Sequence, residues 1–384
     1  MAHFATPADT LFGEGALEEA LPYFQSFGKK ALIVTGKHVG KSPMMERLKE
    51  VLEKGGIGYS VYDGITGEPT VPMVMDGVRL YKEEGCDFLI GIGGGSPLDS
   101  AKAIAAMAVQ EVPLAELNGK EITGQIPPVA AIPTTAGTGS EATKFTVITA
   151  PETDIKMLLK GDILVPKLAV VDPAFTVDMP KSVTACTGLD ALTHAVEAYT
   201  SKKALPFTDP YAVSAVSRIL TYLPRAYKDG RDYEAREQMA VAAYLAGVCI
   251  NNSSVTIVHG MSRPIGALFH VAHGRSNAML IDKCLRFVLD GAYERFGSLA
   301  RLTGVAAKRD SDEAASEKLM DAIAELVKVC EIPTLREYGI EEEAFSIAIT
   351  KMAKDAIASG SPGNCWKTVT AEDCEKLYQE IYDL

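Results

Sequence analysis

Short apolar runs alternate with amphipathic stretches over the first part of the chain. Residues 31–35, 59–62 and 87–92 have the length and composition of buried strands. Between them, residues 42–56 and 71–84 repeat their apolar positions with the period of a helix, and Ser42 followed by proline is a helix-start signal. Because strands and helices alternate, the pattern predicts a Rossmann-like α/β fold with a doubly wound parallel sheet.

Three further segments extend this α/β pattern. Residues 129–133 and 168–172 are apolar runs typical of buried strands. Between them, residues 144–159 contain two β-prone runs separated by the turn sequence PETD. We therefore predict a β-hairpin between two strands of the main sheet.

Strand signals fade beyond Pro180, and the apolar positions then recur with helical period. Residues 190–199, 211–223 and 233–250 are the first of several predicted helices. The change of period predicts two domains. These are an α/β nucleotide-binding domain of residues 1–183 and an all-helical metal-binding and catalytic domain of residues 184–384.

Length, composition and charge agree with an ordinary folded enzyme. The 384 residues exceed the size at which one hydrophobic core usually stops growing. Hydrophobic residues make up 47% and charged residues 23%, as in soluble globular proteins. The net charge of -12, from 50 acidic and 38 basic residues without a basic run, excludes a nucleic-acid partner.

Cysteine usage and hydropathy suggest a cytoplasmic location. The seven cysteines are scattered and include no CxxC pair, which is typical of a reducing compartment. No apolar run approaches the ~18 residues of a membrane span, and the N-terminal sequence lacks the basic start and apolar core of a signal peptide. We expect a cytoplasmic protein without a membrane partner.

A glycine run follows the predicted strand at 87–92. Gly93, Gly94 and Gly95 precede a helix start, where Ser96 is the expected N-cap and Asp99 completes a capping box. Glycines allow close approach of a ligand, and the free amides of a helix start favour a pyrophosphate. A tight strand-to-helix connection explains a lone glycine run equally well.

A second polar loop favours the nucleotide interpretation. PTTAGTGSE, at 133–141, follows another predicted strand, and its Thr134, Thr135 and Thr138 hydroxyls are possible donors to phosphate or ribose oxygens. Two such loops at the carboxyl ends of strands indicate a dinucleotide crevice. The glycine spacing differs from the usual GxGxxG motif.

The helical part of the sequence contains a set of metal-ligand residue types. Asp190 and His194 are four residues apart, on one helix face, although the pair alone better suits a satisfied histidine on a solvated helix. Three of the six histidines, His259, His270 and His273, occur in one short glycine-rich window. One carboxylate with three imidazoles suits Fe²⁺ or Zn²⁺ and leaves a position open for substrate. We expect His259 and His273 to fold back toward the helix of Asp190 and His194.

Several motifs together resemble the iron-dependent, or group III, alcohol dehydrogenase family. They span nearly the whole chain and are GGGSPLDSAK, PTTAGTGSE, the lysine of DIKMLLK, VVDP, TGLDALTHAVEAY, HGMSRPIGALFHVAHGRSNAML and ASGSPGN.

The resemblance implies an oxidoreductase that transfers hydride between NAD(P)(H) and a small alcohol, aldehyde or ketone. Its catalytic cleft would lie between the two domains, and we expect a homodimer or a higher homo-oligomer. The implied metal ligands are Asp190, His194, His259 and His273. The implied cofactor contacts, with Asp99 from the predicted capping box, are Gly94, Gly95, Ser96, Asp99, Thr134, Thr135, Thr138, Thr143, Lys156, Thr176 and Met179.

One position departs from the family pattern. Many members have HGMAH where this chain has HGMSR, so Arg263 replaces a histidine often linked to proton transfer. An arginine does not release a proton near neutral pH. His270 is the candidate catalytic replacement, and a histidine that merely packs against the cleft is the alternative.

The end of the first predicted strand bears on cofactor choice. An acidic residue there typically binds the 2′-hydroxyl of NAD and repels the 2′-phosphate of NADP. In this chain the position holds Gly36 and Lys37, where NAD-preferring relatives often carry aspartate. Lys37, Lys41 and the helix start at Ser42 favour a phosphate, so we predict a preference for NADP(H) over NAD(H). A turn glycine beside a solvated lysine is the alternative.

Two other reactions share the implied architecture. A glycerol dehydrogenase-like polyol oxidoreductase is the closer one, and the spacing of Asp190 and His194 favours the alcohol dehydrogenases over it. A lyase of the dehydroquinate synthase type needs several basic side chains for a sugar phosphate, and beyond Arg263 and Arg275 the metal segment offers few.

Overall fold

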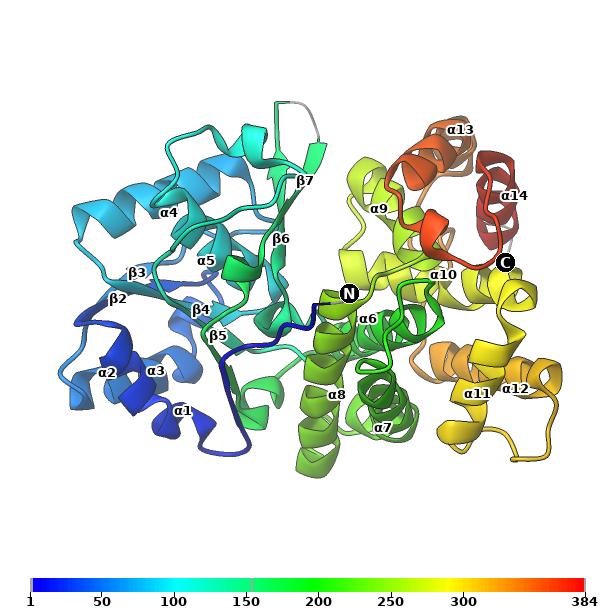
Figure 1. Cartoon of the computed structure of the whole chain (residues 1–384), viewed down its shortest axis with the longest axis horizontal. Helices are drawn as coiled ribbons and strands as arrows, with labels where there is room; N and C mark the ends of the chain where they lie inside the picture. Colours follow the sequence, from blue (N-terminus) through cyan, green and yellow to red (C-terminus); the bar gives the residue numbers. More distant parts are fainter. Residues whose placement is uncertain (1–2, 153–154, 383–384) are drawn as a thin grey trace. The chain divides into compact units, whose positions relative to one another are not determined.

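The computed structural model of the protein describes residues 3–152 and 155–382. The chain forms two units, Met1–Asp178 and Met179–Leu384. The first contains a parallel sheet with flanking helices and the second is helical, which confirms the predicted α/β plus all-α fold class (Figure 1). The predicted domain division after residue 183 falls in the first turn of helix α6 (Lys181–Thr200).

Six parallel strands form the sheet of the N-terminal unit. Their order is β1-β8-β5-β4-β2-β3. β3 lies on one side of β2 and β4 on the other, so the order in which strands are added to the sheet switches sides between β2 and β4. In open α/β sheets ligands bind at the carboxyl ends of the strands beside such a switch point. The strands are β1 (Asp9–Phe12), β2 (Lys30–Val34), β3 (Gly58–Tyr62), β4 (Phe88–Gly93), β5 (Val129–Pro133) and β8 (Leu168–Val171).

Alternate residues of the central strands face two separate cores. Leu32 and Val34 pack with the helices on one side of the sheet, whereas Ala31 and Ile33 pack with those on the other. This alternation follows from the two-residue period of a strand, and burial on both faces explains the nearly continuous apolar runs. One core contains α4 (Val71–Glu83) and α5 (Gly95–Met107), and the other contains α1 (Ala16–Glu19), α2 (Leu21–Phe27) and α3 (Pro43–Lys54).

The predicted hairpin is present as a separate two-stranded antiparallel sheet. It consists of β6 (Phe145–Ala150) and β7 (Ile155–Lys160), and residues 153 and 154 of the predicted turn lie outside the described residues. Ile148, Met157 and Leu159 join the core of α4 and α5. The hairpin therefore covers the helix that begins at the glycine run.

The pattern missed the N-terminal strand β1 and the helices α1 and α2. The strand has only four residues, three of them exposed, so it lacks the buried alternation by which strands are recognised. Its partner is β8, from the other end of the unit. Such pairing depends on tertiary contacts and leaves no local signal.

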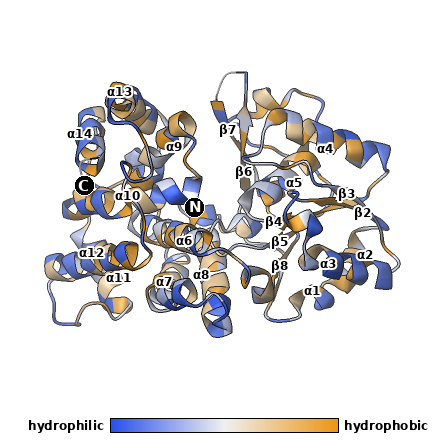
Figure 2. Cartoon of the chain, turned by 180° about the vertical axis from the view of Figure 1, so that it is seen from behind, coloured by the Kyte–Doolittle hydropathy of each residue, from blue (hydrophilic) through white to orange (hydrophobic). Residues whose placement is uncertain are grey.

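Helix α6 is the buried element of the C-terminal unit. Leu189, Leu192, Ala195 and Val196 are fully inaccessible, so the helix is apolar nearly all round. Surface helices such as α12 instead alternate hydrophilic and hydrophobic residues (Figure 2). The other helices are α7 (Asp209–Lys228), α8 (Tyr233–Asn252), α9 (Ile257–Phe269), α10 (His273–Val288), α11 (Tyr293–Leu302), α12 (Asp312–Val329), α13 (Glu342–Ala358) and α14 (Ala371–Tyr382).

Two helices extend beyond their predicted bounds. α6 begins nine residues before Asp190, and α7 continues past its predicted end at residue 223, through Pro224, to Lys228. Along its length α7 packs against α6 and α8. Within the described ranges no single helix has the length and hydropathy of a membrane span; only α8 and α9 together pass that test, and they are bent by 100° at their junction.

Candidate functional site

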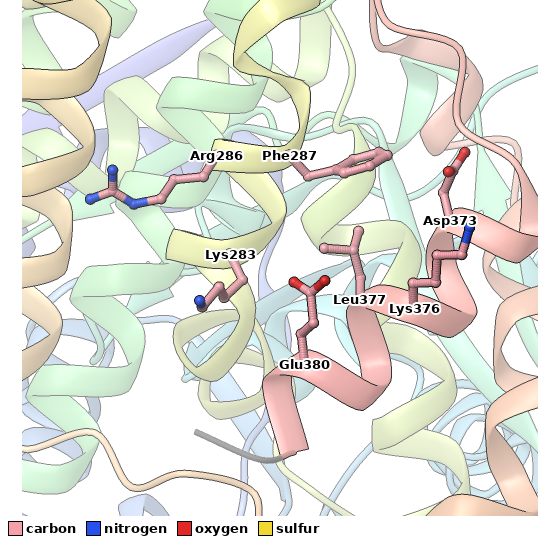
Figure 3. Close-up of a pocket in the computed structure, with 7 residues that line it drawn as sticks. All are labelled: Lys283, Arg286, Phe287, Asp373, Lys376, Leu377 and Glu380. Atoms are coloured by element: carbon pink, nitrogen blue, oxygen red, sulfur yellow. The ribbon is translucent and has the colours of Figure 1, made fainter.

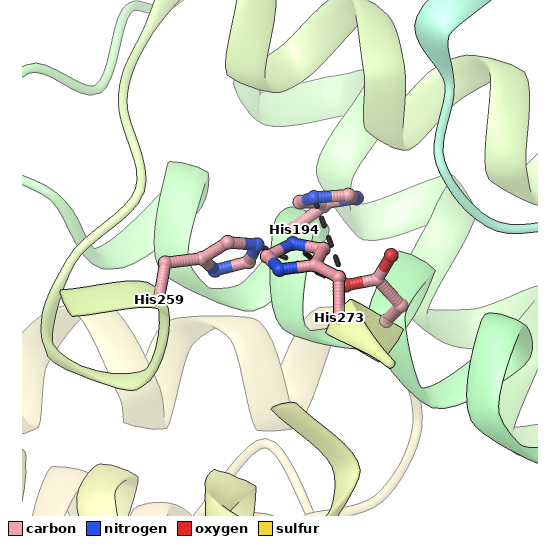
Figure 4. Close-up of side chains that lie close together, drawn as sticks. His194, His259 and His273 are labelled. Atoms are coloured by element: carbon pink, nitrogen blue, oxygen red, sulfur yellow. Dashed lines mark ion pairs between the residues drawn. The ribbon is translucent and has the colours of Figure 1, made fainter. Parts of the chain in front are cut away.

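Four predicted ligands converge inside the C-terminal unit. Asp190 and His194 come from α6, His259 from the first turn of α9, and His273 is the first residue of α10. One ligand atom from each lies within 4.8 Å of all the others. Asp190 Oδ1 is 3.9 Å from His194 Nε2 and 3.8 Å from Nε2 of both His259 and His273. The three imidazoles face one another (Figure 4).

Three of the four ligand side chains are buried and one is partly exposed. Asp190, His194 and His259 are buried, whereas the side chain of His273 is 42% exposed. His273 is therefore the edge of the cluster that solvent reaches.

The donor atoms fit a divalent cation. Distances of 3.8 and 3.9 Å are too long for hydrogen bonds, so the carboxylate and the imidazoles do not satisfy one another. Among the described residues, His194 Nδ1 also lacks a hydrogen-bond partner. His194 Nδ1 lies on the other side of the ring from Nε2, so the fit to a cation rests on the Nε2 atoms and the carboxylate, which are the ligand types that such ions take.

Asn277, which the sequence analysis missed, stands among the ligand atoms. Its Nδ2 donates to Asp190 Oδ1 at 2.7 Å and lies 3.2 Å from His259 Nε2 and 3.1 Å from His273 Nε2. The NH₂ group of Asn277 is thus the positively polarised group that these three acceptor atoms surround. Asn277 follows His273 by four residues on α10, so both lie on one helix face. This spacing in the sequence could have pointed to Asn277.

Glu197, also missed, holds His259 from behind. Its carboxylate accepts hydrogen bonds from Thr256 Oγ1 and the Val258 amide, both at 2.7 Å, and from His259 Nδ1 at 2.5 Å. Because Nδ1 carries the proton, Nε2 of His259 presents its lone pair to the cluster. Burial lowers the pKa of His259 well below its usual range, which keeps the ring neutral.

A glycine allows the helices to approach. A Cβ on Gly274 would lie 3.0 Å from the Cys186 carbonyl oxygen and 3.3 Å from Asp190 Cβ. The start of α10 therefore rests directly on α6, which brings His273 to Asp190. A larger residue at 274 would force the two helices apart.

The two predicted nucleotide loops lie side by side in the N-terminal unit. β4 and β5 are neighbouring parallel strands, with Gly93 opposite Pro133, so both loops leave the same edge of the sheet. Gly93 has φ +147°, a conformation that favours glycine. A Cβ on Gly95 would lie 2.9 Å from Thr138 Cγ2, which leaves no room for a side chain between the loops.

The predicted cap at Ser96 is wrong. Helix α5 begins at Gly95, with Gly94 as its N-cap and no side-chain capping bond, so Ser96 belongs to the first turn. Asp99 is committed elsewhere: its carboxylate accepts from Ser140 Oγ at 2.5 Å and from the Val147 amide at 3.0 Å. It ties α5 to the second loop and the hairpin.

The threonines of the second loop differ in accessibility. Thr135 and Thr138 are partly exposed, whereas Thr134 and Thr143 are buried. The Thr143 hydroxyl accepts a hydrogen bond from Lys102 Nζ at 3.0 Å. Burial lowers the pKa of this lysine to about 8. Thr143 therefore supports the loop from within.

Gly36 and Lys37 follow β2 at the switch point of the sheet. A Cβ on Gly36 would lie 2.8 Å from the Ile65 carbonyl oxygen, so the close approach of two chain segments requires glycine. Lys37 and Lys41 are exposed. Ser42 is the N-cap residue of α3, with proline in its first turn, as predicted.

Three further predicted cofactor residues make contacts within the protein. Lys156, on β7, forms an ion pair with Glu68 at 2.7 Å. The Thr176 hydroxyl donates to the Pro173 carbonyl at 2.8 Å. Met179, partly buried, is the first residue of the C-terminal unit.

His270 is exposed in the connection between α9 and α10. It ends α9 in a left-handed conformation, with φ 54° and ψ 30°. Non-glycine residues rarely adopt this conformation, and such strain is commonest at functional sites.

A surface groove between α10 and α14 is separate from these residues. It has a volume of about 340 Å³ and is lined by Lys283, Arg286, Phe287 and Lys376 among others (Figure 3). Arg286 pairs with Asp282 at 2.8 Å, and Lys376 pairs with Glu372 at 2.9 Å. None of the predicted site residues lines it.

A parallel α/β sheet and a helical unit with four clustered metal-ligand residues are the class of architecture that this chain forms. Comparison with known proteins identifies the family. Iron-containing alcohol dehydrogenase sequences match residues 7–173, and the C-terminal region of the Fe-containing alcohol dehydrogenase family matches residues 184–382. The chain therefore belongs to the iron-containing alcohol dehydrogenase family and is an oxidoreductase.

Individual relatives cover the whole chain. A choline dehydrogenase of Bacillus subtilis is 35% identical over 99% of this chain and 94% of its own. An NAD-dependent methanol dehydrogenase of Bacillus methanolicus is 35% identical over 98% of this chain and 99% of its own. The crystal structure of a 1,3-propanediol oxidoreductase superposes with a TM-score of 0.95 at 34% identity, covering 99% of this chain and 100% of that one.

Replacing Glu197 by glutamine tests how His259 is oriented. The glutamine oxygen would keep the bonds from Thr256 and Val258, which turns its NH₂ group toward His259 Nδ1. The imidazole proton would then move to Nε2 and block the lone pair. We expect Zn²⁺ affinity, measured by chelator competition, to fall about 10- to 100-fold. The exposed Glu294→Gln is the matched control, and an unchanged affinity in Glu197→Gln would contradict this role.

Proposed function

We propose that the protein interconverts a small alcohol and its aldehyde or ketone at a metal centre formed by Asp190, His194, His259 and His273. Fe²⁺ is the proposed ion and Zn²⁺ the alternative. The convergence of the four ligand atoms within 4.8 Å carries this proposal. A divalent ion bound there supplies Lewis-acid polarisation of the substrate oxygen.

The protein's own residues hold and orient the reactants. Asp190 contributes the negative charge of the site, Glu197 orients His259, and the exposed edge at His273 admits the substrate. In the N-terminal unit we assign the cofactor pyrophosphate to the Gly94, Gly95 and Ser96 backbone at the start of α5. Free amides at a helix start bind such a group, and the glycines let it approach.

The remaining cofactor contacts receive different roles. We propose that Thr135 and Thr138 donate hydroxyls to the cofactor, because both are partly exposed beside the glycine run. Thr134, Thr143 and Asp99 support the loops from within. Lys156, Thr176 and Met179 are kept as proposed contacts. To contact the cofactor, the Lys156 ammonium must bind it in addition to Glu68. The Thr176 hydroxyl must give up its hydrogen bond to the Pro173 carbonyl.

The family and the thiols support proposals on the substrate and the location of the protein. Methanol, choline and 1,3-propanediol, in the relatives' names, are all small alcohols. A lyase of the dehydroquinate synthase type is disfavoured by family membership. Seven buried free cysteines support a reducing, cytoplasmic location. We also propose a homodimer or a higher homo-oligomer, which mass photometry of the purified protein measures.

The metal assignment is tested by replacing single ligands. We expect His259→Ala or His273→Ala to lose bound metal and turnover together, because three ligands on rigid helices leave the ion incompletely coordinated. Metal content by mass spectrometry and aldehyde reduction are measured on the same samples. His38→Ala, an exposed histidine of the N-terminal unit, is the control. Full metal content with wild-type turnover in either ligand variant would show that the assignment is wrong.

NADPH is the proposed cofactor, and Lys37 is the residue at which to test it. Gly36→Asp would push against the Ile65 carbonyl, whereas Lys37 is exposed and tolerates a change of charge. Two like charges at 4 Å repel by about 4 kcal/mol at an effective dielectric of 20. After salt screening we expect Lys37→Glu to weaken NADPH binding roughly 10- to 100-fold and to spare NADH.

Lys29→Glu, on the residue before β2 at the opposite end of that strand, is the matched control. The Bacillus methanolicus relative is named for NAD, so wild-type kinetics with both cofactors are the first measurement. An equal or higher kcat/KM with NADH in the wild-type enzyme would overturn the NADPH preference.

His270 is proposed as the group that exchanges the substrate proton with solvent. It is exposed, strained and three residues before His273. Asparagine accepts the left-handed conformation, so His270→Asn removes the titrating ring and keeps the turn. Loss of a general acid or base costs about 10²- to 10⁴-fold in rate, and the pH profile of kcat should flatten. With His38→Asn as control, an unchanged rate and profile would rule this role out.

A further inference from the structure

Arg263 lies one helical turn after His259 on α9. Residues four apart share a helix face, so the guanidinium belongs to the same side of α9 as the metal ligand. Its Nη1 donates to Ser361 Oγ at 3.0 Å, just before the turn at Pro362–Asn364. A Cβ on Gly260 would lie 2.7 Å from Pro362, so α9 is in direct contact with this turn. Two chain segments therefore hold Arg263 in place.

This arginine has no acidic partner in the described part of the chain. The partly buried Arg286 and Arg295 pair with carboxylates at 2.8 and 2.7 Å, whereas no carboxylate lies within ion-pair distance of Arg263. Glu197 is the carboxylate that acts on it electrostatically. Its oxygens already accept the three hydrogen bonds from Thr256, Val258 and His259.

The Arg263 side chain is partly buried, and the Ser361 hydroxyl accepts the hydrogen bond from its Nη1. Arginine has five N–H donors, and burying its charge is costly unless an anion and further acceptors compensate. Burial lowers the pKa of Arg263, and an arginine stays charged in proteins. Burial is also the main cause that lowers the pKa of His259, and the charge of Arg263 adds a smaller contribution. An oxoanion is the partner that the remaining N–H donors of Arg263 suit.

We propose that Arg263 selects substrates that carry an anionic group, a carboxylate or a sulfonate, on the far end of a short carbon chain. The inference rests on the proposed function, because it places the reacting oxygen at the cluster of Asp190 and the three histidines. Four residues of helix advance about 6 Å along the axis, so a few carbon atoms separate the carbonyl from the anionic group. The guanidinium binds that group through paired hydrogen bonds.

The test compares two aldehydes with the same number of carbon atoms, one anionic and one neutral. Succinic semialdehyde and butanal are reduced by the metal-loaded enzyme, and the ratio of their kcat/KM values is measured. We expect the wild type to favour the anion by about 10- to 100-fold, as a charge-assisted pair of hydrogen bonds provides. Arg263→Gln should abolish the preference, and Arg263→Lys should retain part of it. Arg286→Gln, on the surface of α10, is the matched control and should leave the ratio unchanged.

Calorimetry separates this inference from the proposed function. Binding of 4-hydroxybutyrate and of 1-butanol to the enzyme–cofactor complex is measured for wild type and Arg263→Gln, with metal content determined on each sample. Absence of turnover with both aldehydes counts against the proposed function, while tighter binding of the anion by the wild type alone still supports the role of Arg263. A wild-type preference for butanal overturns the inference. The inference is also overturned if Arg263→Gln lowers kcat/KM equally for both aldehydes. The same holds if the variant only raises the KM for NADPH.

Discussion

Four hydrogen-bond acceptor atoms meet in the helical unit without forming hydrogen bonds to one another. This excess of acceptors over donors governs the site. Asp190 Oδ1 stands 3.8 to 3.9 Å from three imidazole nitrogens, and one amide, that of Asn277, is the donor among them. A carboxylate and three imidazoles gathered at such distances are the ligand types that a divalent cation takes. The carboxylate of Glu197 keeps the proton of His259 on Nδ1, so Nε2 faces the cluster as an acceptor.

Close approach of backbone segments shapes both the cluster of metal-ligand residues and the two proposed cofactor loops. Gly274 lets the start of α10 rest on α6, and Gly95 lets the first loop of the sheet rest on Thr138 of the second. In each place a Cβ would occupy space taken by the neighbouring segment. Asp99 then ties the first loop to the hairpin through Ser140 and Val147, so the loops form a supported edge beside the switch point of the sheet.

Charge balance links the metal cluster to substrate choice. A divalent ion held by the cluster would be offset by the buried carboxylates of Asp190 and Glu197. Among the described residues, no carboxylate lies within ion-pair distance of Arg263, although Glu197 acts on it electrostatically. In the proposed substrate site this arginine supplies a binding partner for an anion.

Local patterns in the sequence determined the fold class, the five longer strands of the main sheet and the ligand types, because period, capping residues and side-chain chemistry are properties of short segments. Thus α3 begins after Ser42 and β5 spans Val129–Pro133, as predicted. Only the tertiary structure decided that Gly94 and not Ser96 caps α5, that β1 pairs with β8, and that Glu197 and Asn277 join the cluster. These features depend on contacts between segments far apart in the chain, and such contacts leave no periodic signal in either segment alone.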